Sequence, residues 1–155
     1  LEMKCGALMT RYHKLPEVTA KVMTADGYYR TGDVFRRDGE GFFHFLGRAD
    51  DMFVCGGENI YPGEVEKMLE KHPGIHQAAI VAVPDELKGH KPIAFVVRAG
   101  GAALDEQAVK AHALANAPPY QHPRRVFFVE EMPLAGTNKI DKRALAKQIP
   151  AEGES

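Results

Sequence analysis

The sequence predicts an α+β fold in which helices pack on a small mixed sheet. From about residue 51 onward, runs typical of strands and of helices follow one another in the order β-α-β-β-α-β-α. Two of these runs, residues 75–84 and 91–100, are rich in the branched apolar residues that strands favour. This mixed order of elements favours a compact domain with a layer of helices against a sheet.

The chain is expected to hold one domain and part of another. Residues 1–49 contain a β-hairpin and a tail with too little apolar surface to fold alone. We therefore expect them to be the trailing segment of a large N-terminal domain that this chain lacks. Residues 50–150 would form the compact α+β domain, and residues 151–155 a disordered tail. The whole chain is expected to be a fragment of a longer protein.

The N-terminal part predicts a short helix and a hairpin. The stretch LPEVTAKVM, residues 15–23, suits a short helix. Aromatic and branched residues flank RRDGEG, in which Asp38-Gly39 is a hairpin turn signal. Two antiparallel strands are therefore predicted at about residues 33–37 and 41–46.

A strand, a tight turn and a helix are predicted next. MFVC, residues 52–55, reads as a short strand, and Gly56-Gly57 forces a turn. Pro62 then opens a helix at the position that proline prefers, and Pro73-Gly74 stops it. Its apolar face has i, i+3, i+4 spacing and consists of Ile60, Val65, Met68 and Leu69.

Helix-capping residues and proline-rich turns predict the remaining elements. Residues 105–117 predict a helix with Asp105 as its N-cap. The proline-rich stretch 118–125 predicts an irregular loop, and residues 126–132 a third strand of the domain. Residues 140–149 predict a last helix, with Asp141 near its start, where a negative charge is favourable.

Composition and charge exclude several classes of function. Hydrophobic residues make up 45% of the 155 residues and charged residues 26%, as in globular proteins. The formal net charge of −1 gives no basic field, so no nucleic acid is expected as a partner. No apolar run approaches the ~20 residues of a transmembrane helix, and no signal peptide is recognised. We expect a cytoplasmic protein in which Cys5 and Cys55 are reduced.

Two short motifs contain residues suited to binding a nucleotide. Asp33 follows Gly32 at the edge of a predicted strand, where an aspartate is often only a turn residue. A carboxylate on rigid backbone can also accept hydrogen bonds from both hydroxyls of a ribose. Arg48 has a similar ambiguity, because it suits either an exposed surface position or a ligand clamp.

Three further positions also have a structural and a functional interpretation. Gly56-Gly57 is either a tight turn or a place where the backbone approaches a narrow ligand channel. The basic stretch 122–125 is either a solvated loop or an anchor for phosphate. Lys139, between a Gly-Thr-Asn turn and a helix start, suits either solubility or stabilisation of charge on a reacting phosphate. No metal site is assigned, since Pro73-Gly74 separates His72 from His76.

Several motifs in register resemble a known family. The stretch YYRTGDVFRRDGEGFFHFLGRADDMFVCGGENIYPGEVE, followed later by PLAGTNKIDKRAL, resembles the C-terminal part of an adenylate-forming enzyme. The similarity is greatest to acyl- and aryl-CoA synthetases and covers nearly the whole chain. It implies the mobile C-terminal domain of those enzymes, which act on ATP, CoA and a small-molecule carboxylic acid, fatty or aryl. Mg²⁺ would be held mainly by the missing domain.

The resemblance also implies roles for individual residues. Asp33 would hold the ribose hydroxyls of ATP and of the acyl-adenylate, with help from Arg48, and Asp50 would be the hinge of domain rotation. Lys139 would reach the carboxylate and the α-phosphate during adenylation. Residues at the second substrate would be Gly56 and Gly57 along the pantetheine tunnel, and Tyr120, His122 and Arg124 at the CoA nucleotide.

Other functions stay open at this point. The acceptor of the acyl group could be a carrier protein, or the enzyme could be a luciferase-like oxidase. A non-enzymatic binding module is the third alternative, although such a module has no need for a mobile lysine at position 139. Many relatives carry a tryptophan-glycine pair where this chain has Lys88-Gly89, so an aromatic surface for the CoA adenine is not evident. The fragment alone is expected to be inactive, since no phosphate loop is recognised in it.

Overall fold

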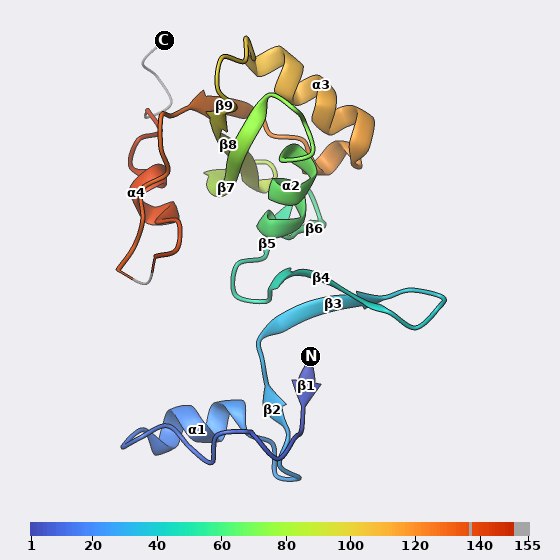
Figure 1. Ribbon diagram of the computed structural model, residues 1–155, viewed down its shortest axis with the longest axis vertical. Coiled ribbons are helices and arrows are strands. Elements are labelled where there is room, and N and C mark those ends of the chain that lie inside the picture. The colour runs from blue at the N-terminus through green and yellow to red at the C-terminus, as the bar shows by residue number, and fades with distance from the viewer. Residues whose placement is uncertain (137, 151–155) are drawn as a thin grey trace. The chain divides into compact units, whose positions relative to one another are not determined.

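The structure is a computed structural model that describes residues 1–136 and 138–150. It separates into two compact units, shown in Figure 1: unit 1 is Leu1–Asp50, and unit 2 begins at Asp51. The predicted disordered tail, residues 151–155, lies outside the described residues. No helix in the described ranges has the length and apolar character needed to span a membrane.

Unit 1 contains one short helix and two small antiparallel sheets. Strand β1 (Glu2–Met3) pairs with β2 (Tyr29–Arg30), and helix α1 (Pro16–Val22) lies between them in the sequence. The helix confirms the prediction for residues 15–23 and has Pro16 in its first turn, where the missing amide hydrogen is tolerated. Throughout residues 1–50, all of which the structure describes, only Gly47 is buried, so unit 1 has no apolar core of its own.

The predicted hairpin is present in unit 1 with a shifted second strand. Strands β3 (Asp33–Arg37) and β4 (Phe43–Arg48) are antiparallel, and a bulge follows Val34. The second strand was expected at residues 41–46 but begins two residues later. The reason is that Asp38 Oδ1 accepts hydrogen bonds from the amides of Glu40 and Phe42, at 3.0 and 2.9 Å, which keeps those residues in the turn.

Unit 2 is built on a five-stranded mixed sheet. The long strands β7 (Ile75–Asp85) and β8 (Gly89–Arg98) form an antiparallel hairpin. On the other side of β8, strand β9 (Arg125–Phe128) pairs in parallel, and β5 (Phe53–Cys55) pairs at the Cys55–Gly89 position. Strand β6 (Glu58–Ile60) completes the order β6-β5-β8-β7 and was not predicted.

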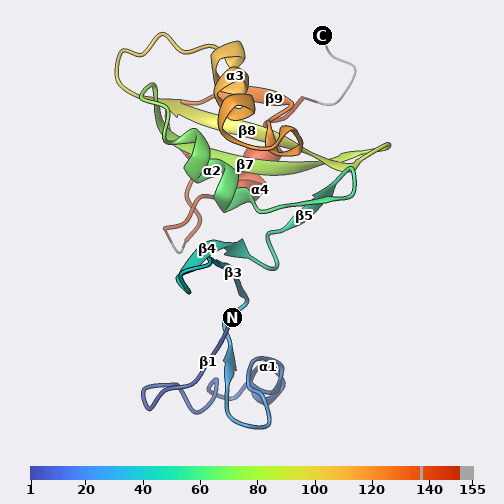
Figure 2. The same cartoon turned by 90° about the vertical axis from the view of Figure 1, so that its right-hand side faces the viewer.

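Helices cover both faces of the sheet of unit 2. Helices α2 (Pro62–Leu69) and α3 (Glu106–Asn116) lie on one face, and α4 (Lys142–Ala146) lies on the other, as Figure 2 shows. Alternate residues of β7, β8 and β9 enter two separate cores, so Ala78 and Ile80 pack towards α2, while Ala79 and Val81 face α4. The fold class predicted from the sequence is confirmed.

Helix starts in unit 2 agree with the predicted caps, whereas several ends do not. Pro62 stands in the first turn of α2, Asp105 accepts from Ala108 N at 2.8 Å, and Asp141 Oδ1 accepts from two amides of α4. The apolar face predicted for α2 is buried. However, α2 ends at Leu69 rather than at Pro73-Gly74, and α4 and β9 are shorter than the predicted ranges 140–149 and 126–132.

Candidate functional site

The candidate nucleotide-binding residues of unit 1 meet at the open end of the β3–β4 hairpin. The register places Asp33 directly opposite Arg48, so both side chains are fixed by strand pairing. Arg48 Nη1 lies 3.4 Å from Asp33 Oδ1 and donates to the carbonyl oxygen of Thr31 at 2.9 Å. Arg48 Nε donates to Asp50 Oδ1 at 2.9 Å. The three predicted residues of this unit are therefore brought together.

The carboxylates of Asp33 and Asp50 flank the Arg48 guanidinium. Its hydrogen bond with Asp50, and secondarily the charge of Asp33, raise the pKa of the Arg48 guanidinium above its ordinary value. Both Arg48 and Asp50 are largely exposed, so this ion pair orients the guanidinium more than it stabilises the fold. The arrangement leaves Asp33 partly accessible, as a carboxylate that accepts ribose hydroxyls must be.

The backbone conformation of the TGD motif, residues 31–33, brings Asp33 and Arg48 into this arrangement. Gly32 has a φ of +74°, and a Cβ on Gly32 would lie 2.8 Å from Arg48 Nη2. The amide of Asp33 donates to Thr31 Oγ1 at 3.0 Å. Thr31 was not among the predicted site residues, although a threonine two residues before an aspartate is a recognisable signal for such a turn.

The Gly56-Gly57 turn joins β5 to β6 in unit 2. Both glycines have positive φ, +60° and +88°, as a two-residue hairpin of this kind requires. A Cβ on Gly57 would meet nothing within 4 Å among the described residues, so backbone conformation rather than crowding explains the two glycines. The structural interpretation of this pair is thereby confirmed, and the tunnel role stays a prediction.

The loop that follows α3 contains the predicted residues Tyr120, His122 and Arg124. Tyr120 lies on the short 3-10 helix η1 (Pro119–Gln121) and packs against the core. His122 Nδ1 lies 2.7 Å from Pro119 O, and Arg124 Nη1 lies 2.9 Å from His122 Nε2. A neutral His122 satisfies both contacts if Nδ1 donates and Nε2 accepts.

The charges of Arg124, Lys110 and Lys88 act on His122, and these three residues are called the cation cluster; Lys110 Nζ is paired with Glu106 Oε1 at 2.7 Å. Burial, and then the charges of Arg124, Lys110 and Lys88, lower the pKa of His122 below its ordinary value. Lys88 also accepts a hydrogen bond from Gly56 N at its carbonyl oxygen, at 2.9 Å, so the cation cluster adjoins the Gly56-Gly57 turn. From the sequence, Lys88 was considered only as a replacement for an aromatic contact to CoA, and Lys110 had no role, because only the fold brings their charges near His122.

Lys139 lies at an exposed turn of unit 2. Leu134 and Ile140 form a β-bridge, and the amide of Ala135 donates to Lys139 O at 2.7 Å. Asn138 has a φ of +60°, the left-handed conformation that asparagine tolerates. Within residues 1–136 and 138–150, no side chain forms an ion pair or hydrogen bond with Lys139 Nζ. The amine is thus available to a ligand.

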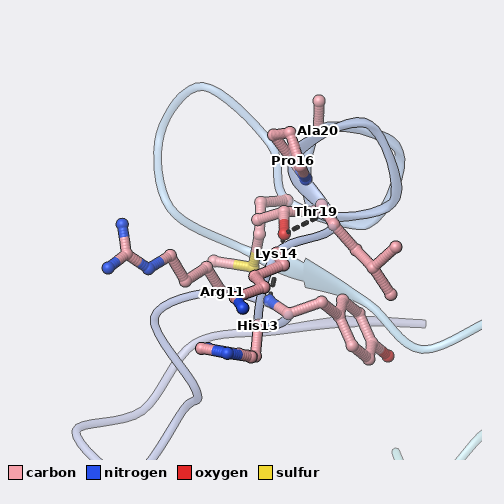
Figure 3. Close-up of a pocket in the computed structure, with 9 residues that line it drawn as sticks. Arg11, His13, Lys14, Pro16, Thr19 and Ala20 are labelled. Atoms are coloured by element: carbon pink, nitrogen blue, oxygen red, sulfur yellow. Dashed lines mark hydrogen bonds between the residues drawn. The ribbon is translucent and has the colours of Figure 1, made fainter.

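We assign no function to the cavity of unit 1 and no metal site to the described residues. A cavity of about 590 Å³ in unit 1 lies beside α1, and Figure 3 shows Thr19 and Lys14 among the residues that line it. None of the predicted site residues lines this cavity. Within the described part of the chain, no group of three or more His, Cys, Asp or Glu side chains could hold a metal ion.

Comparisons with known proteins agree on one family. Residues 64–139 match the family described as AMP-binding enzyme C-terminal domain. The chain is 38% identical to the sulfoacetate–CoA ligase of Cupriavidus necator over 139 residues, which is 90% of this chain and 27% of the ligase. The chain thus spans little more than a quarter of the length of the curated relatives it matches.

Solved structures of the same family have the same fold. The amide bond synthetase McbA from Marinactinospora thermotolerans matches with a TM-score of 0.84 and 35% identity, over 92% of this chain and 29% of its own. The o-succinylbenzoate CoA synthetase MenE from Bacillus subtilis, in complex with its acyl-adenylate, matches with a TM-score of 0.86 and 27% identity, over 99% of this chain and 31% of its own. This chain belongs to the family of adenylate-forming, AMP-binding enzymes and contains their C-terminal domain.

Proposed function

We propose that this chain is the C-terminal part of a carboxylate–CoA ligase. The complete enzyme activates a fatty or aryl carboxylic acid with ATP and then transfers the acyl group to CoA. The observation that carries the proposal is the fixed Asp33–Arg48–Asp50 cluster, in a chain whose relatives include CoA ligases for several acids. Residues 1–49 are the trailing segment of the large domain, and residues 50–150 form its mobile lid.

In the first step a carboxylate oxygen attacks the α-phosphorus of ATP. A bond forms between that oxygen and phosphorus, and the bond to the bridging oxygen of pyrophosphate breaks. Asp33 accepts hydrogen bonds from the ribose hydroxyls, which fixes the nucleotide, while Arg48 keeps the Asp33 carboxylate oriented. Lys139 Nζ offsets the negative charge that builds up on the oxygens of the α-phosphate.

In the second step the thiol sulfur of CoA attacks the carbonyl carbon of the acyl-adenylate. The thiol proton is lost, a thioester forms, and AMP leaves with the shared oxygen. The lid rotates about Asp50 between the two steps, so that Lys139 departs and the Gly56-Gly57 turn faces the acyl-adenylate. His122 and Arg124, with Lys88 beside them, bind the phosphates of CoA, and Tyr120 lies against its nucleotide.

Mg²⁺ accompanies ATP in this proposal and neutralises part of the charge of its phosphates. The described residues offer no cluster that fits a metal ion, so we place its ligands outside this chain.

The acceptor of the acyl group is the point at which related enzymes differ. McbA, which is similar in fold, is an amide bond synthetase. Arg124 and Lys88, whose charges act on His122, favour an acceptor that carries phosphate, as CoA does, over an uncharged amine. A carrier protein also presents a phosphopantetheine arm, but with a single phosphodiester next to it.

The experiment uses the full-length enzyme with a panel of fatty and aryl acids. Pyrophosphate release, AMP and acyl-CoA are measured with ATP, with and without free CoA. We expect acid-dependent pyrophosphate release, and acyl-CoA only when CoA is present. Three results would refute the proposal. They are ADP as the product, no acid-dependent release of pyrophosphate across the panel, and acyl transfer to an amine or a carrier protein in preference to CoA.

A further inference from the structure

A carboxylate of helix α2 contacts both the edge strand of the sheet in unit 2 and helix α4. Strand β7 is an edge strand, since among the described strands it pairs only with β8. Glu66 of α2 reaches this edge, where its Oε1 accepts a hydrogen bond from Ile80 N at 2.8 Å. The same oxygen lies 2.7 Å from the amine of Lys142, the first residue of α4. Because α2 and α4 cover opposite faces, the Glu66–Lys142 pair joins the two layers of helices.

This ion pair is partly protected from water. The side chain of Glu66 is 17% exposed and that of Lys142 is 34% exposed. A pair at this depth is screened less by solvent than a surface pair. Helix α4 has five residues, and Leu145 is its one buried residue. Leu145 and the flanking Ile140 and Ile149 pack against the core, and the ion pair adds a polar constraint on the first turn of α4.

The first turn of α4 is continuous with the turn that carries Lys139. Asp141 caps α4 through its side chain, and its backbone amide donates to Pro133 O at 2.7 Å. The amide of Ala135 donates to Lys139 O at the same distance of 2.7 Å. Residues on both sides of Lys139 thus form one hydrogen-bonded segment, and Lys142 anchors that segment to the sheet.

We propose that Glu66 is a positioning residue for Lys139. It acts through Lys142, by holding residues 138–142 in the place from which Lys139 Nζ reaches the reacting phosphate. This inference rests on the proposed role of Lys139 in adenylation. The reason for a catalytic effect is geometric, because a displacement of about 1 Å of a charge-stabilising group can slow a reaction on the order of 100-fold.

The test measures both half-reactions in the full-length enzyme. Adenylation is followed by single-turnover pyrophosphate release, and thioester formation starts from synthetic acyl-adenylate and CoA. Glu66→Gln keeps an acceptor for Ile80 N but removes the charge, and Lys142→Met removes the other partner. We expect each to slow adenylation about 10- to 100-fold, to leave thioester formation unchanged, and to add nothing when combined. Lys142→Arg should restore the rate.

Glu70→Gln is the matched control. Glu70 lies one turn further along the chain and accepts from Ala78 N on the same strand at 3.1 Å, but it forms no ion pair within the described residues. We expect this variant to adenylate at the normal rate. Equal slowing of both half-reactions by Glu66→Gln, or equal slowing of adenylation by Glu70→Gln, would show a merely structural role and overturn the inference.

Lys139→Ala distinguishes failure of this inference from failure of the proposed function. If Lys139→Ala slows adenylation and Glu66→Gln does not, the positioning role is wrong and the proposed role of Lys139 stands. If Lys139→Ala has no effect, the proposed function of the lysine is wrong, and the inference falls with it. In the Lys139→Ala background, Glu66→Gln should have no further effect on adenylation, and a full additional loss would overturn the positioning role.

Discussion

Asp33 and Arg48 occupy directly opposed positions on the β3–β4 hairpin, with Arg48 Nη1 and Asp33 Oδ1 3.4 Å apart. Asp50 binds the other edge of the same guanidinium, at 2.9 Å from Nε. The guanidinium is thus fixed between two carboxylates, and one of them is the residue proposed to bind ribose. The roles of Asp33 and of the Gly32 backbone can each be tested by one substitution, with a control substitution in the same hairpin.

Asp33→Asn should weaken binding of ATP in the full-length enzyme. A hydrogen bond to a charged group contributes ~1.5–3 kcal/mol, so we expect the KM for ATP to rise about tenfold or more. Steady-state kinetics at varied ATP measure this effect. Asp38→Asn is the control, because Asp38 belongs to the same hairpin but binds the turn amides and His44 instead. An unchanged KM for ATP in Asp33→Asn would contradict the proposed role.

Gly32→Ala should disturb the same cluster through the backbone. The left-handed conformation at Gly32 costs about 1–2 kcal/mol for a residue with a side chain, and the new Cβ would press against Arg48 Nη2 at 2.8 Å. We expect a higher KM for ATP together with a lower melting temperature. Gly39→Ala, which has open space around its Cβ and no positive φ, should change neither quantity. Similar behaviour of the two variants would argue against this explanation.

Lys139→Ala should separate the two half-reactions. Removal of one preorganised donor to a charged transition state typically slows a reaction about 10²–10³-fold, and we expect that loss for adenylation alone. Single-turnover assays with ATP and acid, and then with synthetic acyl-adenylate and CoA, measure the two steps. Lys147→Ala, at the exposed end of α4, serves as the control. Equal loss in both steps would be inconsistent with a lysine that leaves before thioester formation.

His122 should make the stability of the chain depend on pH. Its pKa is lowered in the folded state, mainly by burial, so the unfolded chain binds the proton more tightly. The unfolding free energy therefore falls as the pH drops from the ordinary histidine pKa of about 6.5 through the lower folded value, and this contribution is constant above that window. Urea unfolding at about pH 7.5 and about pH 5.5, on either side of that pKa, measures the difference.

His122→Gln should reduce this pH dependence. His76→Gln replaces an exposed histidine on β7 and should leave it as in the unaltered chain. A second consequence concerns the ligand: a bound phosphate adds negative charge beside His122, so CoA should raise the pKa of this histidine. NMR titration of the ring with and without CoA tests this, and a pKa that stays the same under saturating CoA would contradict the acceptor site.

Local signals in the sequence predicted most helix starts and turns. Pro62, Asp105 and Asp141 act within one helical turn of their own position, and Asp38-Gly39 acts within one hairpin. The strand boundaries were less accurate, because the Asp38 carboxylate extends the turn to Phe42. Strand β6 was missed because three residues between a glycine turn and Pro62 carry too short a pattern to recognise.

The sequence by itself determined the family, the fold class and the candidate residues, because motifs and caps are properties of short stretches of chain. Tertiary structure alone decided which distant residues meet: the parallel pairing of β9 with β8, the cations around His122 and the contact of Glu66 with Lys142. These contacts join residues up to 76 positions apart (66 to 142), and no local pattern specifies them. The Glu66–Lys142 contact, for example, depends on how α2, α4 and the edge strand β7 pack, which is settled only when the whole sheet has formed.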